Sequence, residues 1–231
     1  MDKVDLIILS KAVNENVFKM TQQAIDSVYD RRVNIKVLEQ TDRTYNNATT
    51  IKMDSDFNYN RFANYGARLG KSKWIMIANN DLIFQSNWLE PLLQANMPLV
   101  SPKDPSNRRQ RGLNGNETGD INGRHLSGWC FMIERTLWED IGGFDESVWW
   151  WCSDDAVIEQ CKLKDILPTV VPQSLVIHLG SQTLNIEDTT TKDKLTWSSL
   201  DTYIRKYGNH SLQYSPNYFK WIADNKQFHK H

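Results

Sequence analysis

Short strand-like segments that each end in polar residues place the strongest limit on how this chain can fold. Residues 4–9, 34–38 and 74–78 are rich in apolar side chains over the length of a strand. Between them, apolar residues recur at helical spacing in residues 17–28, and residues 60–69 are expected to form another helix. This alternation predicts an α/β fold, with a mostly parallel central sheet flanked by helices.

The polar residues that follow these strands predict where a ligand binds. Right-handed crossovers would bring the C-terminal ends of parallel strands to one edge of the sheet. Ligands of open α/β sheets bind along that edge. Ser10, Glu39 and Asp81 each come at or just after the end of a predicted strand. The sequence therefore predicts a polar binding site built by three strands.

Charge and cysteine content argue against several other classes of protein. The formal net charge of −1 gives no overall field that would favour nucleic acid or an anionic membrane. The three cysteines, Cys130, Cys152 and Cys161, contain no CxxC pair, which argues against a disulfide framework or a structural zinc site. The N-terminal apolar run is too short for a signal peptide, and no segment has the roughly 18–20 apolar residues of a membrane span. We therefore expect a cytoplasmic protein with no transmembrane segment.

The end of the strand at residues 74–78 is a candidate metal site. Asn79, Asn80 and Asp81 follow it directly. Mg²⁺ and Mn²⁺ prefer oxygen ligands, and the phosphates of a substrate often complete their coordination. The competing interpretation is a polar turn, since Asn and Asp are both common in turns.

A second candidate site lies where three tryptophans precede two carboxylates. Residues 149–151 are all Trp, and Asp154 and Asp155 follow at the expected start of a helix. An apolar wall raises the pKa of a carboxylate and a helix N-terminus lowers it, so such a group could act as a base toward a hydroxyl. The competing interpretation is a helix cap by Ser153 or Asp154 beside core tryptophans.

His178 follows a predicted strand over residues 174–177 and could reach the same edge of the sheet. A neutral imidazole nitrogen would be a second protein ligand for a divalent ion. By itself, however, one histidine after a strand is more often an ordinary surface or core residue. The long segment 101–123, rich in Pro, Asn, Gly and Arg, is expected to be a surface loop, either functional or simply solvated.

These segments together resemble the GT-A glycosyltransferases, most closely those of the family 2 type, over about residues 4–183. The similar segments are residues 57–66 with Asn64-x-Gly66, residues 74–84 with a DxD-type motif, residues 128–133, residues 137–146 with their GGFDE sequence, Asp154-Asp155, and His178-x-Gly180-Ser181. The first Asp of a full DxD motif is replaced by Asn79. Of these segments, the one that contains GGFDE is the most specific match.

The resemblance implies a role for each candidate residue. Asp81 and His178 would bind Mn²⁺ or Mg²⁺ at the diphosphate of a nucleotide-sugar donor, by default a UDP-sugar. Asp154 or Asp155 would deprotonate the acceptor hydroxyl, with inversion at the sugar carbon. The donor contacts would come from Ser10, Glu39, Asn64, Asn79 and Asn80, and the acceptor contacts from Trp129, Trp150 and Trp151.

The same resemblance suggests two parts to the chain. Residues 1–183 would form the nucleotide-sugar-binding and catalytic domain, and residues 184–231 a helical extension packed on it at the candidate acceptor side. Five aromatic residues of the extension would either face the acceptor or pack its helices together: Trp197, Tyr203, Tyr207, Tyr218 and Trp221. The acceptor itself is left open among a glycan, a lipid-linked sugar, a protein and, less favoured by charge, a modified nucleic acid.

Two alternatives to an active transferase belong to other classes. A catalytically silent sugar or nucleotide binder would have the same fold. A nucleotidyltransferase would need a glycine-rich phosphate loop after the first strand, and residues 10–14 contain no glycine. The presence of the carboxylates and of His178 favours the enzyme.

Overall fold

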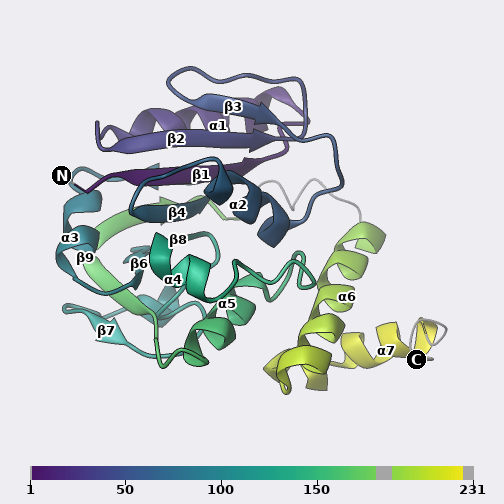
Figure 1. Ribbon diagram of the computed structural model, residues 1–231. Helices are drawn as coiled ribbons and strands as arrows, with labels where there is room; N and C mark the ends of the chain where they lie inside the picture. Colours follow the sequence, from purple (N-terminus) through teal and green to yellow (C-terminus); the bar gives the residue numbers. More distant parts are fainter. Residues whose placement is uncertain (1, 181–188, 226–231) are drawn as a thin grey trace.

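The computed structural model describes residues 2–180 and 189–225, and within them the strands form one nine-stranded sheet (Figure 1). The strand order is β3-β2-β1-β4-β8-β6-β9-β5, and β7 pairs with β9. The strands are β1 (Val4–Ser10), β2 (Val33–Glu39), β3 (Thr49–Lys52), β4 (Trp74–Asn79), β5 (Leu82–Phe84), β6 (Leu99–Lys103), β7 (Glu117–Thr118), β8 (Cys130–Glu134) and β9 (Thr169–His178). The predicted α/β fold is confirmed.

The N-terminal part of the sheet is parallel and the rest is mixed. Strands β3, β2, β1 and β4 run parallel, and so do β6 and β9. Strand β8 lies antiparallel between β4 and β6, and β5 lies antiparallel to β9. Only the first half of the chain alternates strand and helix regularly, and there the parallel pairing expected from that pattern is found.

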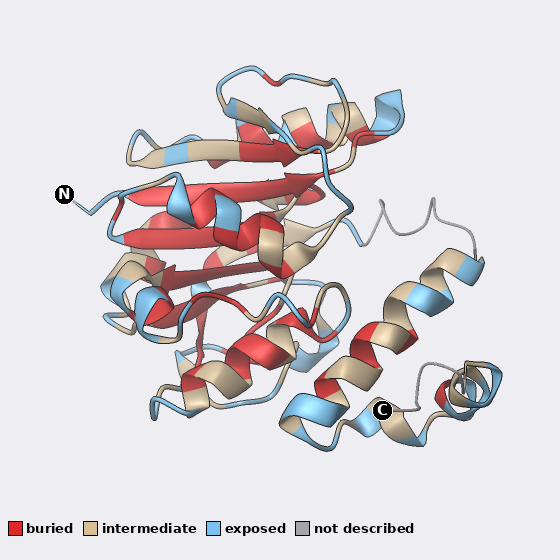
Figure 2. Ribbon diagram, turned by 45° about the vertical axis from the view of Figure 1, so that its right-hand side comes forward, coloured by how far each residue is buried: buried red, intermediate tan, exposed pale blue. Residues whose placement is uncertain are grey.

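Helices cover both faces of the sheet because its strands alternate their apolar side chains between two cores. The helices are α1 (Glu15–Val28), α2 (Tyr59–Arg68), α3 (Leu89–Gln94), α4 (Arg135–Asp140), α5 (Ser153–Lys162), α6 (Thr189–Tyr207) and α7 (Pro216–Asp224), with 3₁₀ turns η1 (Arg108–Gln110) and η3 (Ser211–Tyr214). Leu6 and Ile8 pack with α1 and α3, whereas Ile7 packs with α2, α4 and α5. Figure 2 shows the resulting buried centre of the sheet.

The predicted surface loop over residues 101–123 has more structure than expected. It contains the end of β6, the turn η1 and the short strand β7. Gln110 is fully buried, accepts a hydrogen bond from the Asp104 N–H and donates one to the Arg124 carbonyl. A single glutamine therefore holds together a segment whose composition is that of a loop.

The helices α6 and α7 form a third apolar cluster against the loop that precedes α5, at one side of the sheet (Figure 1). Trp197, Leu200, Tyr203 and Tyr218 are buried there against Cys152 and its neighbours. The domain boundary predicted at residues 183–184, and Ser181 of the resembling segment, lie outside the described residues. Within the described residues, none of the helices combines the length and hydropathy needed to cross a bilayer.

Candidate active site

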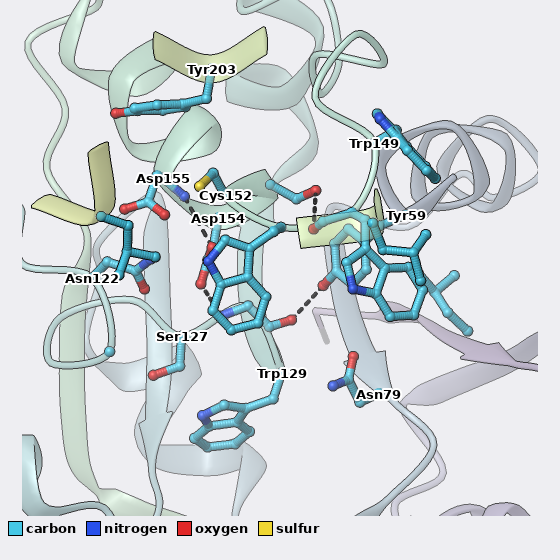
Figure 3. Close-up of a pocket in the computed structure, with 18 of the residues that line it drawn as sticks. Tyr59, Asn79, Asn122, Ser127, Trp129, Trp149, Cys152, Asp154, Asp155 and Tyr203 are labelled. Atoms are coloured by element: carbon cyan, nitrogen blue, oxygen red, sulfur yellow. Dashed lines mark hydrogen bonds between the residues drawn. The ribbon is translucent and has the colours of Figure 1, made fainter. Parts of the chain in front are cut away.

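A cavity of about 1380 Å³ opens at the C-terminal ends of β1, β2 and β4 and reaches α5 and α6. It brings together most of the residues that the sequence singled out. Those on its lining are Asn79, Asn80, Asp81, Trp129, Trp150, Trp151, Asp154, Asp155 and His178. Figure 3 shows part of this wall, with Asp154 and Asp155 on one side and Trp129 and Asn79 on the other.

Asp81 and His178 are brought together by the pairing of β5 with β9. The register places Leu82 opposite His178, and the Leu179 N–H donates a hydrogen bond to the Asp81 carbonyl at 2.9 Å. His178 Nε2 consequently lies 3.3 Å from Asp81 Oδ1. Two residues far apart in the sequence thus present a carboxylate and an imidazole side by side.

The Asp81–His178 pair fits a divalent cation. The His178 ring is stacked on Trp129 at a centroid distance of 5.5 Å, and its buried Nε2 has no hydrogen-bond partner among the described residues. Oxygen and nitrogen ligands about 2.1 Å from a small octahedral cation, at right angles, lie about 3 Å apart. The observed separation of 3.3 Å is close to that value.

Asp154 lies in the first turn of helix α5 and holds the turn before β8. Its Oδ2 accepts a hydrogen bond from the Gly128 N–H at 2.9 Å, and its Oδ1 accepts one from the Asp155 N–H at 3.1 Å. The phenol of Tyr59 donates to the Gly128 carbonyl on the other side of the same glycine. Burial, and next the charge of Asp155, raise the pKa of Asp154 to about 6.

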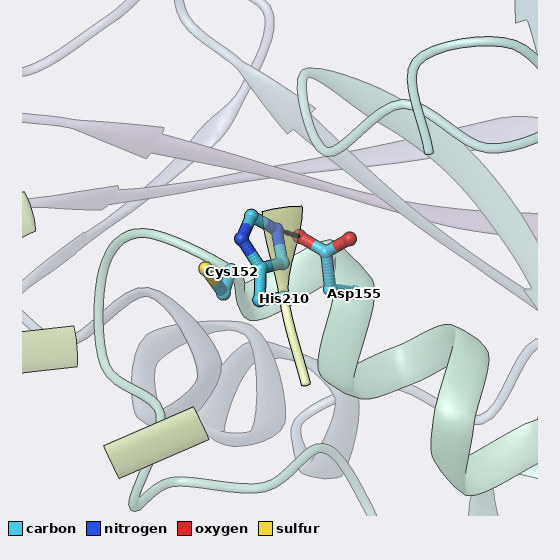
Figure 4. Close-up of side chains that lie close together, drawn as sticks. All are labelled: Cys152, Asp155 and His210. Carbon is cyan, nitrogen blue, oxygen red and sulfur yellow. Dashed lines mark ion pairs between the residues drawn. The ribbon is translucent and has the colours of Figure 1, made fainter. Parts of the chain in front are cut away.

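Asp155 lies on the cavity beside residues from other parts of the chain (Figure 4). Its Oδ2 is 3.8 Å from Nε2 of His210, which precedes η3. Ligand atoms of Cys152, Asp155 and His210 all lie within 4.8 Å of one another, so in type and spacing the trio is compatible with a metal ion. Cys152 has a left-handed backbone with φ of 63°, which turns the chain from the tryptophans into α5.

The three consecutive tryptophans, Trp149, Trp150 and Trp151, all line the cavity. The Trp150 ring meets the edge of Phe57 at a centroid distance of 5.0 Å, which fixes its plane. Trp151 is 41% exposed. An exposed indole beside a cavity offers a face on which a sugar ring can stack.

Two of the predicted donor contacts, Ser10 and Glu39, lie behind the cavity wall. They are register partners at the ends of β1 and β2, and both are buried. The Glu39 carboxylate is occupied by the Ala12 N–H and the Tyr45 hydroxyl. These bonds shape the loops that carry Lys11 and Gln40 to the cavity, so the geometry favours an indirect role.

The side chain of Asn64 likewise makes its hydrogen bonds within the protein. It is absent from the cavity lining, and its amide donates to the Phe144 carbonyl and to Glu146, while its oxygen accepts from Phe144 N–H and Trp138 Nε1. It therefore anchors the GGFDE segment. The predicted donor contact of Asn64 has no geometric support. Asn80 lines the cavity but donates to Thr21 and Ser10.

The fold also brings to the cavity residues that the sequence left without a role or with an open one. Ser127 is 2% exposed, and its hydroxyl has no partner among the described residues. Tyr203 of α6 reaches the cavity beside Asp155, as Figure 3 shows, while Trp197 and Tyr218 only pack the extension. Arg108 and His210 also line it. The sequence assigns no role to Ser127 or His210, whereas Arg108 belongs to an arginine-rich segment and Tyr203 is one of the aromatic residues of the extension expected either to face the acceptor or to pack its helices.

Comparison with known proteins supports the fold alone. Neither protein-family models nor proteins of curated function match the sequence. Among the solved structures that resemble the chain are GalNAc-T7 with UDP, GalNAc and Mn²⁺, at 12% identity, and the mannosyltransferase PcManGT from Pyrobaculum calidifontis with GDP-Man and Mn²⁺, at 13%, each with a TM-score of 0.60. The likeness covers 98% and 94% of this chain, but 57% and 68% of those chains. The chain has the GT-A fold.

Proposed function

We propose that this protein is a metal-dependent glycosyltransferase that moves a sugar from a nucleotide-diphosphate donor to an acceptor hydroxyl. The observation that carries the proposal is that the Asp81–His178 pair and the Asp154–Asp155 pair line one cavity in a GT-A fold. The two similar structures, which hold UDP or GDP-Man together with Mn²⁺, support the same class of chemistry.

The donor would occupy the end of the cavity at β1, β2 and β4. Asp81 and His178 are the residues that would hold Mn²⁺ or Mg²⁺. A bound cation would neutralise the negative charge that develops on the leaving nucleotide diphosphate. Gln40, Lys11 and Asn79 line the adjoining wall and would contact the nucleotide. A UDP-sugar remains the default from the sequence resemblance, and GDP-sugars are the second class to test.

The acceptor would lie between the tryptophans and α5. A carboxylate there would take the proton of the acceptor hydroxyl as its oxygen bonds to the anomeric carbon. The bond from that carbon to the phosphate oxygen breaks, and its electron pair leaves with the diphosphate. Attack from the face opposite the leaving group inverts the anomeric centre.

Between the two adjacent carboxylates, we assign the base to Asp155. Both oxygens of Asp154 already accept backbone N–H groups, and one of them holds Gly128. A carboxylate whose two oxygens both accept backbone hydrogen bonds is suited to holding the backbone of the site in place. Asp155 lies on the cavity with its carboxylate toward His210. Asp155→Asn should therefore spare donor binding and lower transfer by on the order of 10²–10⁴-fold, the usual contribution of a positioned base.

Donor hydrolysis separates an enzyme from a silent binder of the same fold. We expect the purified protein to hydrolyse at least one of UDP-GalNAc, UDP-glucose and GDP-mannose, with MnCl₂ required. Asp81→Asn should abolish this hydrolysis. Asp54→Asn, at a carboxylate that is 83% exposed, is the control and should keep it. Nucleotide-sugar binding without hydrolysis of any donor, with or without acceptors, would favour the silent binder.

A further inference from the structure

The C-terminal extension contributes a histidine to the cavity. His210 follows α6 and lies beside Asp155, and both side chains are largely enclosed, with 15% and 16% of their surfaces exposed. The distance from His210 Nε2 to Asp155 Oδ2 is 3.8 Å. A hydrogen bond needs about 2.7–3.2 Å, and catalytic hydrogen bonds are often long until the substrate is bound. A small side-chain adjustment would therefore join the two groups.

The tautomer of His210 is set by its second nitrogen. The Leu212 N–H donates a hydrogen bond to His210 Nδ1 at 3.1 Å and so caps the turn η3. Because a backbone N–H can only donate, Nδ1 must be the acceptor, and the ring proton lies on Nε2. The nitrogen that faces Asp155 is therefore a hydrogen-bond donor.

The same tautomer argues against a metal ion at this trio. A metal ligand must offer a lone pair, and here Nε2 carries the proton. The third member, Cys152, is 3% exposed, and burial raises the pKa of its thiol. A thiol binds metal as thiolate, which this environment opposes. Hydrogen bonding explains the arrangement better than coordination does.

The orientation of the imidazole is held by packing as well as by the cap. The Tyr203 ring of α6 meets the His210 ring edge-on, with centroids 5.6 Å apart and an interplanar angle of 81°. The ring is thus fixed on one side by the extension's own helix and at Nδ1 by η3. Its remaining polar atom faces Asp155.

We propose that His210 is a positioning residue that donates from Nε2 to the Asp155 carboxylate and aims it at the acceptor. This inference rests on the proposed function for its effect on transfer, whereas the hydrogen bond can be tested without it. In this arrangement the C-terminal extension completes the active site, since neither His210 nor its supports belong to the sheet-bearing part of the chain.

Kinetics of His210 variants test the effect on transfer. With the donor that the wild type hydrolyses fastest among UDP-GalNAc, UDP-glucose and GDP-mannose, His210→Ala should lower kcat by about 10- to 100-fold, the range for one hydrogen bond to a charged group. The KM for the donor should stay within about twofold, because the donor site is untouched. His210→Gln, whose amide can place a donor near the position of Nε2, should recover part of kcat.

A matched control lies in the same turn. Tyr214 of η3 is 71% exposed, and Tyr214→Ala should leave kcat and KM unchanged. Equal loss in Tyr214→Ala and His210→Ala would mean that η3 matters only for folding, and would overturn the proposal. So would a His210→Gln protein no better than His210→Ala, or a wild-type kcat in His210→Ala.

Nitrogen-15 NMR of the imidazole rings tests the hydrogen bond even in a protein that transfers nothing. We expect the Nε2–H tautomer for His210, and Asp155→Asn should shift its ring signals while leaving those of His125 unchanged. A proton on Nδ1, no response to Asp155→Asn, or loss of the Nε2 proton on addition of ZnCl₂ would each overturn the proposal. A protein with these NMR properties but no donor hydrolysis would count against the proposed function alone.

Discussion

Asp154 is the residue whose surroundings most alter its chemistry. Its carboxylate is partly enclosed next to Asp155, and burial together with that neighbouring charge raises its pKa from 3.8 to about 6. The two backbone N–H groups that it accepts lower the pKa again, but less strongly. The protonated form is thus favoured in the folded protein more than in the unfolded chain.

This shift predicts how stability depends on pH. Because the folded pKa is the higher one, the contribution of Asp154 to stability is fully present below about pH 3.8 and is lost as pH rises through about 6. The size of the loss is on the order of 2–3 kcal/mol. Asp154→Asn, which cannot ionise, should therefore gain stability relative to the wild type between pH 4 and pH 7, as measured by urea unfolding.

The test is how the difference in free energy of unfolding between Asp154→Asn and the wild type changes with pH. Asn also alters one of the hydrogen bonds that Asp154 accepts, which shifts this difference by the same amount at every pH. Asp54→Asn, at an exposed carboxylate, serves as the control and should show little such change. A difference between Asp154→Asn and the wild type that is flat from pH 4 to pH 7 would contradict the raised pKa.

At the scale of elements, the site depends on how the start of α5 meets the turn before β8. Gly128 lies between Asp154, which accepts from its N–H, and Tyr59, which donates to its carbonyl. A Cβ at this position would lie 2.8 Å from Asp154 Oδ2 and 3.0 Å from its Cγ. Position 128 therefore favours glycine, because the Asp154 carboxylate lies too close for a Cβ atom.

Gly128→Ala should push Asp154 away and damage both stability and transfer. We expect a loss of about 1–3 kcal/mol in the free energy of unfolding, the usual cost of an overpacked site, together with reduced donor hydrolysis. Gly115→Ala is the matched control, because a Cβ there meets nothing within 4 Å. Equal stability of Gly128→Ala and Gly115→Ala would show that the backbone or Asp154 can move to make room for a Cβ at position 128.

The elements themselves were largely predictable where the chain alternates strand and helix. The helix expected at residues 60–69 is α2 (Tyr59–Arg68), and the strand at residues 74–78 is β4 (Trp74–Asn79). The short strands β5 and β7 have no such pattern, because their pairing with β9 depends on contacts distant in sequence. The strand expected at residues 174–177 is the end of the longer strand β9 (Thr169–His178), which has a register irregularity opposite Pro102 and Lys103.

Predictability of the site followed the same division. Asp81, Asp154, Asp155 and His178 stand next to element ends that the sequence pattern shows, and the fold brings them to one cavity. His210 has no such marker: it reaches Asp155 only through the packing of α6 against the α5 loop. Burial beneath the loops, rather than any sequence signal, separates Ser10 and Glu39 from the cavity.

For the whole molecule, the proposed function predicts a linked response to metal and nucleotide. A ligand that binds only the folded protein raises its stability in proportion to RT ln(1 + [L]/Kd), about 2.7 kcal/mol at a hundred times Kd. UDP or GDP should therefore raise the Tm by several degrees when MnCl₂ is present and much less in EDTA. Differential scanning fluorimetry measures both.

The control for this measurement is Asp81→Asn, which should lose the metal-dependent part of the shift. Asp54→Asn should keep it. A nucleotide shift that is equal in MnCl₂ and in EDTA would contradict the assignment of Asp81 and His178 as cation ligands, while leaving nucleotide binding itself in place.

The cavity is lined by two separate parts of the chain, and this has an evolutionary consequence. The proposed cation ligands Asp81 and His178 lie at strand ends, whereas Tyr203 lies on α6 and His210 just before η3, in the part of the chain that packs through its own apolar cluster. Such a segment can diverge, or be exchanged in a chimera, while the strands next to Asp81 and His178 stay the same. Under the proposed function, a lineage of proteins built in this way would be able to change its acceptor while keeping its donor sugar.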